Sequence, residues 1–268
     1  MLYIRKLREK KTKADESFRT VSTKDEYTHS PPQPSQPVTS FRLDRIDLES
    51  YICPGIDKIY FIPNLITEEQ EAYLLSCICG EESDWVTLKT RRLKCFSTEE
   101  NAEGTFPLPD WLQALLASLV ECGAWTSEAF FPNHVLINEY KAGQGILHHT
   151  DGPSYLNNTL ILSLLSSAML TFRRKLGAGE IGVTSSAEER KQRRLFLTPR
   201  SLLRFESQAY DAHLHGIEEM FEDAVDNSDG LLLNYKSVGL ENGAEIPRGQ
   251  RISLTIRHKF NTGSGLVA

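Results

Sequence analysis

The sequence predicts a mainly β fold with flanking helices, built as an antiparallel sandwich or an open barrel. From residue 134 onward, short apolar or alternating segments follow one another, separated by turns and polar stretches. Two amphipathic helical segments precede these strands. No apolar run approaches the roughly 18 residues that a membrane-spanning helix requires, so we expect no membrane association.

One strand and two helices are predicted before residue 134. Residues 58–63 are largely apolar and end in a proline, which is typical of a short strand. Thr67 and Gln70 have the spacing of a capping box, so we expect a helix to start there. The second helix follows from about Pro109, where apolar side chains recur at helical spacing: Trp111, Leu112, Leu115, Leu116 and Leu119.

Short strands dominate the rest of the chain. The predicted strands are residues 134–140, 159–166, 168–172, 195–197, 201–206 and 251–260. We expect residues 195–197 and 201–206 to pair as a hairpin around Pro199 and Arg200. This succession favours a sandwich or barrel architecture.

The distribution of polar residues divides the chain. Residues 1–45 begin with a basic run and continue as a Ser- and Pro-rich segment with few apolar side chains, so we expect a disordered tail. Residues 46–260 then form the folded domain, and residues 261–268 form a C-terminal tail. Two polar insertions, residues 173–194 and 221–250, are expected to be surface loops, and the second is interpreted as a lid.

Charge and cysteine content limit the functional classes. The net charge is -6, so any nucleic-acid binding must rest on local basic patches. The five cysteines are odd in number and lack zinc-site spacing, which indicates free thiols in a reducing compartment. The basic start of the chain is compatible with nuclear import, and we expect a location in the nucleus, the cytoplasm or both.

Two histidines and one aspartate have the pattern of a metal site. His149 and Asp151 lie two residues apart at a predicted strand end, so their side chains project to the same side. With the distant His215 they can form a 2-His-1-carboxylate triad, which is typical of non-haem Fe(II) oxygen chemistry. His213 is the main rival for the third position, and His148 is out of phase with Asp151.

The final strand carries a polar face that can bind an anion. That face consists of Arg251, Ser253, Thr255 and Arg257. Interior guanidinium groups are costly unless an anion meets them, and arginine suits carboxylates. Asn138 and Tyr140 offer an amide and a phenol to the same anion. These groups and the triad together describe a site for 2-oxoglutarate; the alternative is a solvated polar face.

A cationic loop lies between the two helices. It runs from Trp85 to Phe106 and carries Lys89, Arg91, Arg92 and Lys94. Such a loop could bind a nucleic-acid strand through charge and stacking. The alternative is a solvated surface hairpin.

These residues together resemble the AlkB-type Fe(II)/2-oxoglutarate-dependent dioxygenases, most closely the branch called AlkB homologue 6. The resemblance covers roughly residues 58–260. The matching strings are Asn138-x-Tyr140, His149-Thr150-Asp151-Gly152-Pro153-x-Tyr155, Pro199-Arg200-Ser201-Leu202-Leu203, Leu214-His215-Gly216-Ile217 and Arg251-x-Ser253-Leu254-Thr255-Ile256-Arg257.

The resemblance implies a double-stranded β-helix, or jelly roll, with the N-terminal helices packed outside. It implies an enzyme that uses Fe(II), 2-oxoglutarate and O2, with iron bound by His149, Asp151 and His215. Arg251 would pair with the distal carboxylate of 2-oxoglutarate, helped by Tyr140, Asn138 and Ser253, with Arg257 near its other end. The segment from Trp85 to Phe106 corresponds to a nucleotide-recognition lid, and Tyr155 is a further candidate substrate contact.

The resemblance also implies a substrate class. We expect a monomer that oxidatively demethylates alkylated DNA or RNA, presented as a single strand or a flipped base. Pro153 replaces an acidic residue that base-repairing members often carry, and Ser253 replaces an asparagine of some members. The alternatives are a hydroxylase or demethylase of protein side chains and a catalytically silent nucleic-acid-binding module.

Overall fold

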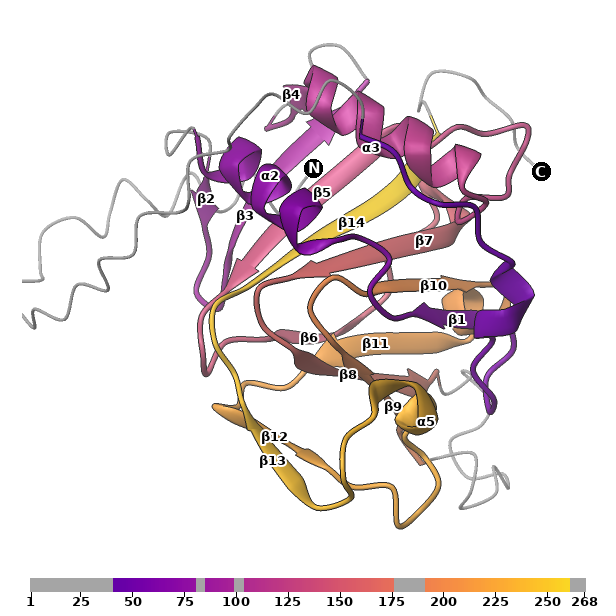
Figure 1. Ribbon diagram of the computed structural model, residues 1–268, viewed down its shortest axis with the longest axis vertical. Helices are drawn as coiled ribbons and strands as arrows, with labels where there is room; N and C mark the ends of the chain where they lie inside the picture. Colours follow the sequence, from indigo (N-terminus) through magenta and orange to yellow (C-terminus); the bar gives the residue numbers. More distant parts are fainter. Residues whose placement is uncertain (1–40, 81–84, 99–103, 176–190, 261–268) are drawn as a thin grey trace, which may run out of the picture. The chain divides into compact units, whose positions relative to one another are not determined.

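The computed structural model describes residues 41–80, 85–98, 104–175 and 191–260. All of them lie in one compact unit, Pro34–Ala268 (Figure 1). The predicted C-terminal tail, most of the N-terminal tail and the centre of the 173–194 insertion fall outside the described residues. No helix in the described ranges is long and apolar enough to cross a membrane.

Two antiparallel sheets form the body of this unit. In spatial order, the eight-stranded sheet contains β1 (Ile59–Ile62), β10 (Leu202–Glu206), β7 (Tyr155–Leu164), β14 (Arg251–Lys259), β5 (His134–Tyr140), β3 (Arg92–Ser97) and β2 (Val86–Thr87), with the parallel β4 (Phe106–Pro107) beside β3. The four-stranded sheet contains β6 (Ile146–His149), β11 (His213–Ile217), β8 (Ala168–Arg174) and β9 (Arg193–Leu197). Because the chain passes repeatedly between the two sheets, the predicted jelly roll is confirmed.

Two helices, α2 (Glu68–Cys79) and α3 (Asp110–Glu121), cover the outer face of the larger sheet (Figure 1). The capping box of α2 is present: Thr67 Oγ1 accepts from the Gln70 amide at 3.2 Å, and Gln70 Oε1 accepts from the Thr67 amide at 2.9 Å. The buried face of α3 carries Leu112, Leu115, Leu116, Ser118 and Leu119. Shorter helical turns are η1 (Leu48–Tyr51), α4 (Gln208–Asp211) and α5 (Tyr235–Val238).

Side chains of the central strands point alternately to the two faces of the larger sheet, and this produces two apolar layers. In β14, Ile252 and its even-numbered neighbours pack against the helices, while Arg251 and its odd-numbered neighbours face the smaller sheet. In β7, Leu160 and Leu162 likewise join the helix layer, and Ile161 joins the layer between the sheets. The functional side chains therefore lie between two sheets, where apolar neighbours exclude water. The five cysteines, all within the described ranges, form no disulfide bond with one another.

The hairpin predicted around Pro199 and Arg200 does not form. Residues 195–197 belong to β9, which pairs with β8, and β10 pairs with β1 and β7 in the other sheet. Arg200 adopts φ 62° at the crossing. Both segments carry buried apolar side chains on both faces of the strand, so these side chains do not indicate which strand each segment pairs with.

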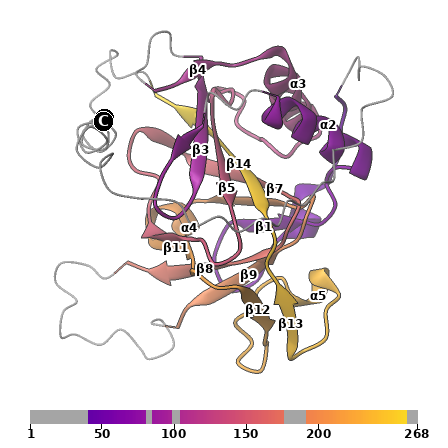
Figure 2. The ribbon, with the colours of Figure 1, turned by 90° about the vertical axis from the view of Figure 1, so that its left-hand side faces the viewer.

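The 221–250 insertion is more ordered than a surface loop. It forms the hairpin β12 (Glu222–Val225) and β13 (Ala244–Pro247), which Figure 2 shows beyond the smaller sheet. Val225 packs in a small core with Phe196. Asp223 and Arg248 form a buried ion pair at 2.5 Å, so the prediction of a loop was wrong here.

Two further boundaries differ from the predictions. Residues 85–106 do not form a loop: β3 joins the larger sheet beside β5, and only residues 99–103 are not described. Core packing also starts before residue 46, because Phe41 is buried against the α2 and α3 layer. An isolated aromatic residue next to a polar tail gave no local periodicity from which this could be inferred.

Candidate active site

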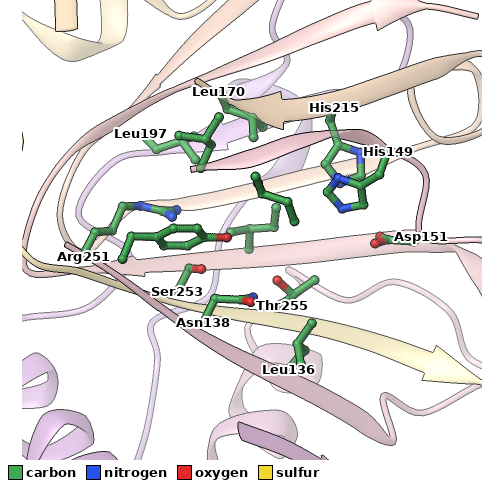
Figure 3. A pocket seen from close by; sticks show the side chains of 14 residues that line it. Leu136, Asn138, His149, Asp151, Leu170, Leu197, His215, Arg251, Ser253 and Thr255 are labelled. Atoms are coloured by element: carbon green, nitrogen blue, oxygen red, sulfur yellow. The ribbon is translucent and has the colours of Figure 1, made fainter. Parts of the chain in front are cut away.

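A narrow cavity lies between the two sheets, and side chains of both sheets line it (Figure 3). The lining includes most of the predicted site residues: Asn138, Tyr140, His149, Asp151, His215, Arg251 and Ser253. Apolar walls are supplied by Leu136, Ile146, Ile161, Leu170, Leu197 and Ile217. Figure 3 shows the histidine pair near one end of this cavity and Arg251 at the other.

The neighbouring strands β6 and β11 bring the histidine pair together. His149 lies opposite His215 in the strand register, and their ring centroids are 4.4 Å apart. Gly216 permits this approach, since a Cβ there would lie 2.9 Å from the backbone nitrogen of His148. Asp151 follows β6, and the ligand atoms of the three residues all lie within 4.8 Å of one another. The donor set and spacing suit a single metal ion.

Both imidazoles can offer a lone pair to a metal ion. His149 Nδ1 lies 2.8 Å from the Leu147 carbonyl oxygen. Because a carbonyl only accepts, Nδ1 carries the proton and Nε2 keeps its lone pair. Burial lowers the pKa of His215 to about 4, although Asp151 opposes this shift. His215 is therefore neutral at neutral pH, which is the form that binds metals.

The carboxylate of Asp151 is held on both oxygens. Arg257 donates to Oδ1 at 2.8 Å, and the hydroxyl of Thr159 donates to Oδ2 at 3.0 Å. Burial alone would raise the pKa of Asp151, but Arg257 and the two histidines outweigh it and lower the pKa. Each oxygen keeps a further lone pair, so a charged, oriented ligand remains available.

The other end of the cavity is cationic. Arg251 is 3% exposed and donates to the Ser163 hydroxyl at 2.9 Å, while its Nε has no hydrogen-bond partner. Burial lowers the pKa of this guanidinium to about 10, so it remains charged at neutral pH. In the described part of the chain, no carboxylate forms an ion pair with it. A buried, unpaired guanidinium is costly, and an anionic ligand would offset that cost.

Neutral polar groups lie beside the guanidinium of Arg251. Tyr140 lies opposite Arg251 in the β5–β14 register, with the guanidinium carbon 5.8 Å from the ring centroid. Ser253 and Asn138 form the next pair of the same register and also line the cavity. An amide, a phenol and a hydroxyl therefore stand beside one cation, a combination that fits a small carboxylate.

Comparison with known proteins identifies the family. The family model described as the 2OG-Fe(II) oxygenase superfamily matches residues 84–257. A Danio rerio protein named "Probable RNA/DNA demethylase ALKBH6" is 34% identical over 217 residues, covering 80% of this chain and 91% of that protein. The chain belongs to the 2OG-Fe(II) oxygenase superfamily. The predicted likeness to AlkB-type enzymes is thereby confirmed.

More distant relatives have lower sequence identity to this chain. The Macaca fascicularis tRNA (carboxymethyluridine(34)-5-O)-methyltransferase ALKBH8 is 27% identical over 210 residues, covering 73% of this chain and 29% of that protein. The structure of OsALKBH1 covers 78% of this chain at 13% identity, with a TM-score of 0.47. Enzymes of the superfamily use Fe(II), 2-oxoglutarate and O2. The histidine–aspartate cluster and the unpaired Arg251 fit the metal and the co-substrate of such an oxygenase.

Most of the predicted substrate-contacting cations of this oxygenase are engaged within the protein. Arg92 pairs with the buried Glu139 at 2.6 Å and lies 4.4 Å from the centroid of Trp85. Lys94 is 3% exposed and donates to the Ile78 carbonyl oxygen at 3.0 Å. The buried ammonium of Lys94 is therefore not presented to a ligand, contrary to the prediction. The alternation of β3 turns it toward α2, which residue composition alone did not reveal.

Three other predicted residues have different surroundings. Lys89 is exposed at the β2–β3 turn. Arg91, at the same turn, donates to Asn138 Oδ1 at 3.0 Å and so contacts the cavity wall rather than solvent alone. Tyr155 begins β7, and its ring centroid lies 4.0 Å from the guanidinium carbon of Arg257. Arg257 contacts the carboxylate of Asp151 and is absent from the cavity lining.

The rival histidines lie outside the oxygenase cluster. His213 Nδ1 donates to the Gln208 carbonyl oxygen at 2.9 Å, and His148 Nε2 lies 2.7 Å from Thr171 Oγ1. Two supporting residues, Thr159 and Ser163, were missed in the sequence. Both lie on a predicted strand in phase with Ile161, so period-two alternation could have placed them beside the site.

Proposed function

We propose that this oxygenase oxidatively demethylates alkylated nucleic acid. The observation that carries the proposal is one cavity with two complementary ends. One end holds the cluster of His149, Asp151 and His215, and the other holds the buried Arg251, which no carboxylate of the described residues pairs with. The cluster would hold Fe(II), and Arg251 would hold the distal carboxylate of 2-oxoglutarate. The name of the Danio rerio relative supports nucleic acid as the substrate class.

The protein's own contribution is to orient the metal-ligating side chains and to exclude water from the cavity. Arg257 and Thr159 fix Asp151, and the Leu147 carbonyl oxygen fixes the tautomer of His149. Apolar walls on both sheets keep solvent away from the reacting groups. Bound iron, with 2-oxoglutarate and O2, supplies the oxidant for a substrate C–H bond.

The overall reaction converts 2-oxoglutarate and O2 to succinate and CO2 and hydroxylates an N-methyl group. The hydroxymethyl product then releases formaldehyde and leaves N–H. We propose a single-stranded or flipped base as substrate, because the histidine–aspartate cluster lies between the two sheets, where a base that stays stacked in a duplex could not reach it. We propose that the protein acts as a monomer, in the nucleus, the cytoplasm or both.

The test is succinate formation with Fe(II) and ascorbate over methylated single-stranded DNA and RNA. Wild type and His149→Ala are compared, with His213→Ala as the matched control. We expect oligonucleotide-stimulated turnover in wild type and His213→Ala, and at least about 100-fold less in His149→Ala, because loss of a direct metal ligand should cost no less than loss of an outer-shell partner. Equal succinate formation by wild type and His149→Ala would overturn the proposal.

A second candidate is hydroxylation or demethylation of a protein side chain. It is favoured by the engagement of Arg92 and Lys94 within the protein, which leaves fewer cations for phosphates. The same assay with methylated peptides distinguishes the two. Peptide-stimulated turnover without any response to oligonucleotides would replace the nucleic-acid proposal.

A further inference from the structure

The β2–β3 turn brings a guanidinium onto the cavity wall. Residue 92 lies opposite Glu139, and Leu93 lies opposite Asn138 in the β3–β5 register. Arg91 is therefore in phase with Leu93, on the face of the sheet that carries Asn138. A backbone hydrogen bond from the Leu88 amide to the Arg91 carbonyl oxygen, 2.8 Å, closes the turn and fixes this position.

The contact determines which way the Asn138 amide faces. Arg91 Nε donates to Asn138 Oδ1 at 3.0 Å. An amide has one acceptor end and one donor end, so binding the oxygen to a cation leaves the NH2 group for other partners. Asn138 is 4% exposed and lines the cavity, where an amide oxygen would repel an anion and an amide NH2 would bind it.

Arg91 also adds positive charge at this end of the cavity. Burial raises the pKa of Tyr140, and the charges of Arg251 and Arg91 act in the opposite direction on the same phenol. The guanidinium of Arg91 in the β2–β3 turn and that of Arg251 in β14 therefore both act on Tyr140. Arg91 is only half-buried, so the protein bears a smaller desolvation cost for it than for Arg251.

We propose that Arg91 is a positioning residue for 2-oxoglutarate: it holds the Asn138 amide with its NH2 group toward the co-substrate. The inference rests on the proposed binding of 2-oxoglutarate at Arg251. It assigns Arg91 to the co-substrate instead of the nucleic-acid strand. Lys89, two residues earlier and exposed on the same turn, is the matched control for surface charge.

The first test is calorimetric binding of 2-oxoglutarate to the full chain loaded with Mn(II), which prevents turnover. Arg91→Met keeps the aliphatic stem and removes the donors, and Arg91→Lys keeps the charge. We expect binding about tenfold weaker in Arg91→Met, the loss of one charge-assisted hydrogen bond, with a smaller loss in Arg91→Lys. Lys89→Ala should bind like wild type.

A double-mutant cycle with Asn138→Ala separates positioning from a general loss of fold. If Arg91 acts through the amide, Arg91→Met should have little further effect once Asn138 is alanine. In turnover assays, Arg91→Met should raise KM for 2-oxoglutarate while kcat and KM for the oligonucleotide change less.

The outcomes distinguish this inference from the proposed function. Wild type that fails to bind 2-oxoglutarate would overturn both. Equal binding by wild type and Arg91→Met would overturn the inference alone, as would an Arg91→Met effect confined to KM for the oligonucleotide. Additive effects of Arg91→Met and Asn138→Ala would likewise exclude action through the amide.

Discussion

The cavity and the β2–β3 hairpin both carry cationic side chains, but they use them in opposite ways. In the cavity, Arg251 is buried, and among the described residues its Nε has no hydrogen-bond partner and no carboxylate forms an ion pair with it. On the hairpin, Arg92 pairs with Glu139, and Lys94 binds a backbone carbonyl oxygen. A cation is therefore available to a ligand when its environment leaves it unsatisfied, and a basic stretch in the sequence does not establish that.

The largest expected effect is on the KM for 2-oxoglutarate when Arg251 is replaced. Arg251→Met should raise KM for 2-oxoglutarate about 100-fold, because it removes the buried partner of the distal carboxylate. The same substitution should raise the thermal unfolding midpoint of the ligand-free protein, since a buried unpaired charge is lost. The measurements are succinate kinetics and calorimetric unfolding. A lower midpoint with unchanged KM would make Arg251 a structural residue.

Replacement of Arg92, on the β2–β3 hairpin, should reduce stability and leave 2-oxoglutarate binding nearly unchanged. Arg92→Met leaves Glu139 buried without its partner, so we expect a loss of roughly 1–3 kcal/mol in the free energy of unfolding. KM for 2-oxoglutarate should stay within about twofold of wild type, because Arg92 pairs with Glu139 and packs on Trp85, and neither of these residues lines the cavity. Chemical denaturation and succinate kinetics test this. Lys89→Met is the control and should leave stability unchanged.

Acidification should destabilise the protein through His134, which is buried at the start of β5. Burial lowers the pKa of His134 from 6.5 to about 3. Below pH 6.5 the unfolded chain binds a proton that folded His134 does not bind, so stability is full above that pH and falls toward pH 3. Denaturation midpoints of metal-free protein at pH 7.5 and pH 5 measure the effect. In His134→Asn, the denaturation midpoints at pH 7.5 and pH 5 should lie closer together than in wild type. If they lie as far apart as in wild type, titratable groups other than His134 cause the loss of stability.

The smallest expected effect concerns the exposed cation of the hairpin. If a nucleic-acid strand crosses the β2–β3 turn, Lys89→Ala should reduce the salt dependence of oligonucleotide binding by a slope of about one. Binding isotherms between low and moderate salt measure it. A slope equal to that of wild type would place the strand elsewhere on the surface.

Local patterns were sufficient for the helices and for the chemistry of the site. The capping box at Thr67 and the leucine spacing of α3 depend on neighbours within one or two turns, and both are present. The period-two alternation of residues 251–257 likewise placed Arg251 and Ser253 on one face. The pairing of strands that lie far apart in the sequence could not be predicted from local patterns. Strands β9 and β10 each carry buried apolar side chains on both faces, so these side chains do not distinguish a hairpin from a crossing between sheets.

The sequence already indicated that two histidines, an aspartate and an arginine pair could form an iron and carboxylate site. That follows because each residue type has a fixed donor chemistry, and because His149 with Asp151, and Arg251 with Ser253, have the spacing of one strand face. Which cations remain available depends on the fold, which paired Arg92 with Glu139, buried Lys94, placed Arg257 on Asp151 and directed Arg91 to Asn138. Those outcomes depend on which strands become neighbours and on what they bury, because burial and partners decide whether a charge is free or satisfied.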